Sequence, residues 1–148
     1  MKLPDANLLL YAVDSSSPLH EPARTWLEER LSGTETVAFA WSVLLAFLRL
    51  RTNPRIYEFP LPVEEAFGLV DSWLAQPCAT VIHPTDRHSG LLRELLFPLG
   101  TAGNLTTDAH LAALAIEHGA ELCSADADFS RFPGLRWVNP LSPQQRRR

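Results

Sequence analysis

Short apolar stretches alternate with longer segments whose apolar residues recur at helical spacing. In residues 20–31, for example, Ala23, Leu27 and Leu31 recur every four residues, so they line one face of a predicted helix. The apolar stretches between such segments are short, which indicates short strands. The predicted strands are residues 2–4, 36–38, 80–82, 122–124 and 136–138.

Helical segments separate the predicted strands along the chain. They are residues 6–12, 20–31, 41–51, 63–75, a segment that ends near 96, and 108–118. Strands that alternate with helices predict a parallel sheet covered by helices on both faces. We therefore expect an α/β fold, a three-layer sandwich with a short, mostly parallel central sheet, in a single domain.

Individual side chains refine several of these elements. The helix 41–51 is apolar on nearly all sides, which predicts deep burial, and Arg49 and Arg51 are expected at its solvent end. Three prolines between residues 52 and 62 predict a structured loop there. Helix starts are expected at capping residues, namely Asp5, Thr85 or Asp86, and Thr106 or Thr107.

The composition is that of a globular protein, with 46% apolar and 20% charged residues among 148. That length predicts one domain, residues 1–141, followed by a basic C-terminal tail, residues 142–148. The apolar run 37–48 is too short to span a bilayer and the N-terminus lacks a signal-peptide pattern, so we expect a cytoplasmic protein that does not associate with membranes. Cys78 and Cys123 stand alone at apolar positions, as reduced core cysteines do.

The net charge is −4, and all but one of the 13 basic residues are arginines. A protein that binds nucleic acid by bulk electrostatic attraction would be basic. An acidic protein that handles RNA or DNA therefore needs metal ions and a few local arginines to offset its carboxylates. Arg49, Arg51 and Arg55 are candidates for contacts with RNA phosphates, or they form a plain solvated helix end.

The stretch 121–132 carries the strongest chemical signal. Its apolar run 122–125 stops at two carboxylates, Asp126 and Asp128. A carboxylate at the end of a buried strand is costly unless it binds something positive. Taken alone, either aspartate is also a good cap for a helical turn at 128–132.

Two further aspartates are expected at the same edge of the sheet. Asp5 follows the first strand and Asp126 the fourth, so both lie at the carboxyl edge, where ligands bind in parallel sheets. Asp108 begins the helix that leads into the fourth strand, and that helix start faces the same edge. Clustered carboxylates repel one another unless a cation joins them, and all-oxygen ligands favour Mg²⁺ or Mn²⁺. Such ions held by aspartates suit the hydrolysis of phosphodiesters.

Four segments resemble the motifs of one family. They are residues 5–12 (DANLLLYA), 41–54 (WSVLLAFLRLRTNP), 108–119 (DAHLAALAIEHG) and 124–129 (SADADF). In this order and spacing they resemble the PIN-domain ribonucleases, and most closely the VapC toxins of bacterial toxin–antitoxin pairs. The resemblance covers nearly the whole chain and extends to the Asn-Pro-Leu at 139–141.

The resemblance implies a Mg²⁺-dependent endoribonuclease that acts as a toxin, with Mn²⁺ as a substitute ion. The family's first, third and fourth acids match Asp5, Asp108 and Asp126, so these are the expected metal ligands and catalytic residues. Asp128 matches an auxiliary catalytic acid that some members carry.

This sequence departs from the family pattern at one position. The second family acid, a Glu on the helix after the second strand, falls on Ala46, and no acidic residue lies between Glu35 and Glu58. Three aspartates plus waters still suffice for one Mg²⁺. The alternative is a catalytically weak PIN-fold module that binds RNA or a protein partner. Asn7 and Ser124 match polar positions that support the cluster in the family.

The resemblance also implies partners: an RNA substrate, a cognate VapB-like antitoxin, and a second copy of the chain in a homodimer. An antitoxin arginine among the aspartates would compete with the metal by charge pairing. Leu8, Leu9, Trp26 and Leu27 on the first helices form a candidate docking groove for the antitoxin, or they are ordinary core residues.

Other reaction classes find little support in the chain. An aspartyl-phosphate phosphatase needs a second acid where Asn7 stands and a distant lysine, whereas the sole lysine is Lys2. No glycine-rich phosphate loop is present. The five histidines show no zinc-ligand spacing and are expected to be structural or on the surface.

Overall fold

The protein is seen here in a computed structural model, which describes residues 1–100 and 102–143. Most of the predicted basic tail, residues 144–148, lies outside the described residues. The strands are β1 Lys2–Pro4, β2 Val37–Phe39, β3 Ala79–Val81, β4 Glu121–Cys123 and β5 Trp137–Val138. Each lies within one residue of a predicted strand, so the strand predictions are confirmed.

Helices connect the strands, as the sequence pattern predicts. The α-helices are α1 Ala6–Val13, α2 His20–Leu31, α3 Trp41–Arg51, α4 Val63–Leu74, α5 His88–Leu96 and α6 Thr106–His118. The short 3₁₀ helices are η1 Phe97–Leu99, η2 Gly103–Leu105 and η3 Ala127–Arg131. Within the described part of the chain, no helix is long and apolar enough to cross a membrane.

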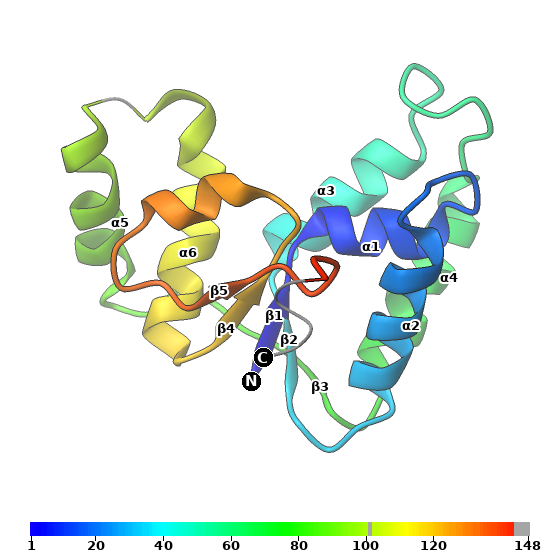
Figure 1. The fold of residues 1–148 in the computed structure, drawn as a ribbon, viewed down its shortest axis with the longest axis horizontal. Coiled ribbons are helices and arrows are strands. Elements are labelled where there is room, and N and C mark those ends of the chain that lie inside the picture. The colour runs from blue at the N-terminus through cyan, green and yellow to red at the C-terminus, as the bar shows by residue number, and fades with distance from the viewer. Residues whose placement is uncertain (101, 144–148) are drawn as a thin grey trace.

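The five strands form one sheet in the order β3-β2-β1-β4-β5, and every pairing is parallel. The predicted α/β sandwich is therefore confirmed, with a sheet that is wholly parallel. Helices α1 to α4 gather on one side of the sheet in Figure 1, and α5 and α6 on the other. Strand β1 occupies the centre, and its pairing with β4 sets Pro4 opposite Cys123. The residues that follow β1 and β4 are therefore neighbours at the carboxyl edge.

The core explains why such short strands suffice. In a parallel sheet both faces are covered, so strand residues are apolar without alternation. Leu3, Leu122 and Phe39 are fully buried. Phe47 of α3 and Phe39 of β2 both contact the ring of Trp73 on α4, with ring centroids 4.9 Å and 6.4 Å apart. This aromatic contact fixes α3 and α4 against the sheet.

Helix α3 differs from its prediction at both ends. Trp41 and Leu45 are 42% and 58% exposed, so the helix has one solvent face although it is apolar nearly all round. Arg51 was expected in solvent, but it is only 7% exposed. Its guanidinium donates to the Phe59 carbonyl at 2.9 Å and lies 4.4 Å from the centroid of the Tyr57 ring. The loop 52–62 folds back over α3, which buries this arginine.

Two predicted caps also differ. Helix α6 begins at Thr106 directly after η2 and has no side-chain cap, because the Thr106 hydroxyl donates to the Gly103 carbonyl instead. Before α5, the Thr85 hydroxyl accepts from the Arg87 N–H at 3.2 Å, but the helix starts only at His88. The earlier start of α6 leaves Asp108 within its first turn, as predicted.

Candidate active site

Asp5 is fixed at the carboxyl edge by the junction of β1 and α1. It is the N-cap of α1, and its Oδ1 accepts from the Ala6 N–H at 2.7 Å. Its Oδ2 accepts from the Ser124 hydroxyl at 2.7 Å. An aspartate cap has to sit at the first turn of its helix, so the local fold alone determines where this carboxylate lies.

Ser124, directly after β4, holds the edge together. It is fully buried. Besides donating to Asp5, its hydroxyl accepts from the Asn7 amide at 3.1 Å and from the Asp126 N–H at 3.0 Å. The Asn7 side-chain oxygen in turn accepts from the Ala125 N–H at 3.3 Å. These bonds join two segments that are far apart in the sequence and set the spacing between Asp5 and Asp126.

Asp126 confirms the capping interpretation and remains open to the second one, in which it binds a cation. It is the N-cap of η3, and its Oδ1 accepts from the Asp128 N–H at 2.9 Å. A carboxylate has about four lone-pair sites, so one capping bond leaves capacity for another ligand. The cap also turns the chain so that Asp128 follows on the same edge.

Three of the four predicted acids form a tight group, which we call the acidic trio: Asp108, Asp126 and Asp128. One oxygen from each lies within 4.8 Å of the other two. Asp5 is outside this group, although it is close enough for its charge to act on both Asp108 and Asp126. We call the trio together with Asp5 the acidic cluster.

Burial and mutual repulsion raise the pKa values of two carboxylates of the cluster. Burial, and after it the charges of Asp5, Asp126 and Asp128, together raise the pKa of Asp108 to about 6. Burial also raises the pKa of Asp5, against the hydrogen bonds from Ser124 and Ala6, which lower it. A divalent cation would relieve this repulsion.

The donor set fits a hard cation. All candidate ligand atoms are carboxylate oxygens, which suit Mg²⁺ or Mn²⁺. Oxygens around one Mg²⁺ lie about 3–4 Å apart, so the trio needs only a small inward movement to share an ion. Ala46, on α3, contributes no carboxylate, and α3 contains no acidic residue at all.

One charged neighbour was missed by the sequence reasoning. Arg131, at the end of η3, places Nη2 3.6 Å from Oδ1 of Asp128. The signal was available as the spacing Asp-x-x-Arg, but it is informative only if the turn is a 3₁₀ helix, in which residues three apart are aligned.

The histidines lie outside the acidic trio. His88, the first residue of α5, contacts two residues of α6, with Nδ1 3.0 Å from Glu117 Oε1 and Nε2 2.9 Å from His110 Nδ1. Glu117 has no exposed side-chain surface and also accepts from the Thr85 hydroxyl at 3.1 Å. This network joins α5 to α6, which is a structural role of the kind that the sequence predicts.

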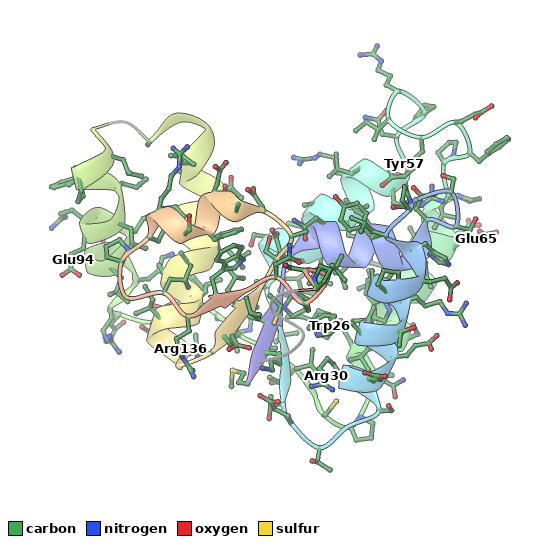
Figure 2. The ribbon with its side chains drawn as sticks, in the orientation of Figure 1. Trp26, Arg30, Tyr57, Glu65, Glu94 and Arg136 are labelled. Atoms are coloured by element: carbon green, nitrogen blue, oxygen red, sulfur yellow. The ribbon has the colours of Figure 1, made fainter. Side chains whose placement is uncertain are left out.

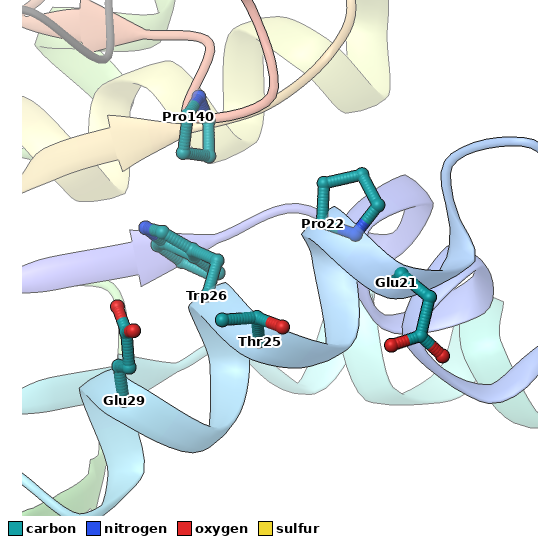
Figure 3. A pocket seen from close by; sticks show the side chains of 6 residues that line it. All are labelled: Glu21, Pro22, Thr25, Trp26, Glu29 and Pro140. Carbon is teal, nitrogen blue, oxygen red and sulfur yellow. The ribbon is translucent and has the colours of Figure 1, made fainter.

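The candidate docking groove for an antitoxin is mostly core. Leu8 and Leu9 are fully buried and Leu27 is 6% exposed, so these three leucines offer no surface. Trp26 is different, since it lines a pocket of about 460 Å³ (Figure 3). The other lining residues are Glu21, Pro22, Thr25, Glu29 and Pro140.

Known proteins share both the sequence and the fold. The family model of the PIN domain matches residues 2–135. Ribonuclease VapC37 of Mycobacterium tuberculosis is 51% identical over 140 residues, which covers 95% of this chain and 97% of the relative. Ribonuclease VapC33 of the same organism is 42% identical over 141 residues, covering 95% and 99%.

Solved structures agree at the level of the fold. VapBC2 from Rickettsia felis, bound to a promoter DNA fragment, has a TM-score of 0.67 at 22% identity, covering 93% of this chain and 97% of its own. VapC20 of M. tuberculosis, described as a toxin that cleaves the sarcin–ricin loop, has a TM-score of 0.63 at 18% identity, covering 92% and 99%. The matched segment 2–135 contains the whole acidic cluster, and the chain belongs to the PIN-domain family, among the VapC ribonucleases.

Proposed function

We propose that this protein is the toxin of a toxin–antitoxin pair and that it cleaves RNA phosphodiester bonds as a Mg²⁺-dependent endoribonuclease, with Mn²⁺ as a substitute ion. The observation that carries the proposal is the acidic trio, next to Asp5, at the carboxyl edge of the sheet. The names of the VapC relatives support RNA as the substrate. An enzyme with that substrate acts where RNA is translated, which is the cytoplasm.

Asp5, Asp108 and Asp126 are the proposed metal ligands, with Asp128 as a further catalytic acid. A bound Mg²⁺ supplies an acidified water and polarises phosphoryl oxygens. The chain's own contribution is to hold the ligands in place: Ser124 orients Asp5 by donating to its Oδ2, and the η3 cap orients Asp126. The raised pKa of Asp108 comes first from burial and then from the repulsion of the other three aspartates, and a cation would offset that repulsion.

The test is cleavage of structured RNA by the purified protein in Mg²⁺, in Mn²⁺ and in EDTA. Asp5→Asn and Asp126→Asn keep the size of the side chain and remove a charge from the cluster. We expect both to abolish metal-dependent cleavage, whereas Asp71→Asn on the exposed face of α4 serves as the matched control. Metal-dependent cleavage that persists in both cluster variants would overturn the assignment of the site.

The absence of an acid on α3 favours a second candidate, a catalytically weak module that binds RNA or a protein partner. Ala46→Glu restores a carboxylate at the position where the family pattern has one. If the natural protein binds RNA but does not cleave it, and Ala46→Glu does cleave it, the weak module is the correct description. Cleavage by the natural protein itself removes this candidate.

Two protein partners are proposed as well. Structural neighbours include toxin–antitoxin complexes, which supports a VapB-like antitoxin for this chain. A second copy of the chain is the other proposed partner, and Trp41 and Leu45 offer an exposed apolar pair, one turn apart on α3, for such a contact. Sedimentation of the purified toxin, alone and with its co-expressed upstream gene product, tests both.

A further inference from the structure

One arginine stands out in the charge pattern around the acidic cluster. Among the ion pairs of the described residues, only the pair with Arg131 involves a member of the cluster, at 3.6 Å from Asp128. The two side chains are 57% and 49% exposed. An ion pair so exposed contributes little to stability, so its position is the informative property.

The fold fixes the backbone of Arg131 and leaves its side chain in solvent. In a 3₁₀ helix residues three apart are eclipsed, which puts Arg131 directly over Asp128. Helix η3 is held at its start by the Asp126 cap. It is also held by Phe129 and Phe132, which are 1% and 3% exposed and have ring centroids 6.1 Å apart.

The basic residues nearest to β1 and β4 are at the opposite edge of the sheet. Lys2, at the start of β1, pairs with Glu121 at the start of β4. Arg136 donates to the carbonyl of Gly119, the residue that ends α6, and Figure 2 shows it far from η3. An RNA chain that approaches the carboxyl edge therefore meets Arg131 and neither of these two.

The net charge of the site indicates a role for Arg131. Four carboxylates and one divalent ion still leave a negative site, which repels an RNA phosphate. We propose that Arg131 binds a phosphate of the RNA next to the bond that is cut, an inference that rests on the proposed function. Without metal, Asp128 holds the guanidinium. Once Asp128 binds a cation, the guanidinium N–H groups of Arg131 are free to donate two parallel hydrogen bonds to phosphate oxygens.

The affinity for metal, measured without RNA, distinguishes a phosphate-binding role of Arg131 from a structural role in η3. Arg131→Gln removes a positive charge that competes with the cation for Asp128. We expect Mn²⁺, titrated by calorimetry, to bind about two- to fivefold more tightly to this variant, in keeping with the modest strength of an exposed pair. The control is Arg24→Gln on α2, because Arg24 is 52% exposed and pairs with Glu28 at 3.1 Å, and no change is expected there. A residue that merely stabilised η3 would weaken metal binding when replaced.

RNA binding gives the second readout. The probe is a labelled single-stranded RNA oligonucleotide of mixed sequence, with Ca²⁺ in place of Mg²⁺ so that the RNA stays intact. We expect Arg131→Gln to lower the affinity about tenfold and to reduce the slope of log K against log salt by about 0.7, the value for one phosphate contact on a single strand. In EDTA the same replacement should lower the affinity less, because Asp128 then competes with the phosphate for the arginine. Arg131→Lys keeps the charge but loses the planar guanidinium. Compared with Arg131→Gln, it should therefore restore the salt slope but only part of the RNA affinity.

Three results would overturn the inference: weaker Mn²⁺ binding in Arg131→Gln, an equal loss of RNA affinity in Arg24→Gln, or an equal loss in EDTA and in Ca²⁺. None of these measurements requires cleavage. If the natural protein cleaves no RNA in Mg²⁺ or Mn²⁺, the proposed function is wrong, and if cleavage persists in Asp5→Asn and Asp126→Asn, the assignment of the site is wrong. If only the Arg131 measurements fail, the nuclease assignment stands without a phosphate-binding arginine.

Discussion

Replacing Asp108 by asparagine should stabilise the metal-free protein. The folded protein raises the pKa of Asp108 from 3.8 to about 6, chiefly by burial and then by the charges of the other three aspartates. At about 1.4 kcal/mol per unit, that shift corresponds to roughly 3 kcal/mol of destabilisation at neutral pH. The carboxylate is only partly buried, so solvent screening reduces the expected gain from Asp108→Asn to about 1 kcal/mol.

The stability difference between the variant and the natural protein should depend on pH in one direction. A carboxyl whose pKa is raised by folding contributes stability below its unfolded pKa, and that contribution is lost as the pH rises through the folded value. The variant and the natural protein should therefore have similar unfolding free energies near pH 4. The advantage of Asp108→Asn should grow between the unfolded pKa of 3.8 and the folded value of about 6. It should rise most steeply midway between them, at about pH 5, and level off above the folded pKa.

Urea unfolding in EDTA at low salt, at several values of pH across this range, measures the effect. Asp71→Asn, in an exposed position of α4, is the control and should show no such trend. Adding Mg²⁺ should reverse the order, because an ion that binds only the folded natural protein stabilises it by mass action. A variant that is less stable than the natural protein at pH 7 in EDTA would refute the idea that burial and the neighbouring charges destabilise the ionised Asp108, as would a gain that is the same at pH 4 and pH 7.

Three further changes test other parts of the molecule. Ser124→Ala removes the donor to Asp5 and leaves buried polar groups unpaired, so we expect a loss of about 1–3 kcal/mol in urea unfolding and weaker Mn²⁺ binding. Arg51→Met keeps the buried aliphatic part of the side chain but loses the hydrogen bond to the Phe59 carbonyl. It should lower the free energy of unfolding by about 1 kcal/mol and speed proteolysis within 52–62. Arg49→Met, at an exposed site, is the control and should do neither. Trp73→Ala opens the aromatic contact between β2, α3 and α4, with an expected loss of about 3–5 kcal/mol in the same unfolding assay.

The sequence was informative wherever a local pattern determines structure. Strands and helices follow from apolar spacing, and their alternation predicts a parallel sheet, which puts Asp5 and Asp126 at one edge. The capping preference of aspartate correctly identifies the starts of α1 and η3. These inferences need only the neighbours of each residue in the chain.

Contacts that depend on the path of a loop were beyond this reasoning. From the sequence, Arg51 is expected in solvent at the end of α3, but the loop 52–62 folds over it. The spacing of apolar residues does not predict the path of that loop. In the same way, sequence places four acids near one edge but does not say which oxygens approach one another. That Asp128, and not Asp5, completes the acidic trio depends on the tight turn of η3.

The central place of β1 also sets the order of events during synthesis. Asp5 is synthesised well before the Ser124 hydroxyl that holds it, because Ser124 lies 119 residues further along the chain. At roughly 5–20 residues per second, that interval lasts on the order of ten seconds. Throughout it, the growing chain has neither β4 beside β1 nor the acids of α6 and η3. The acidic cluster of a nascent chain therefore cannot assemble before η3 has been synthesised.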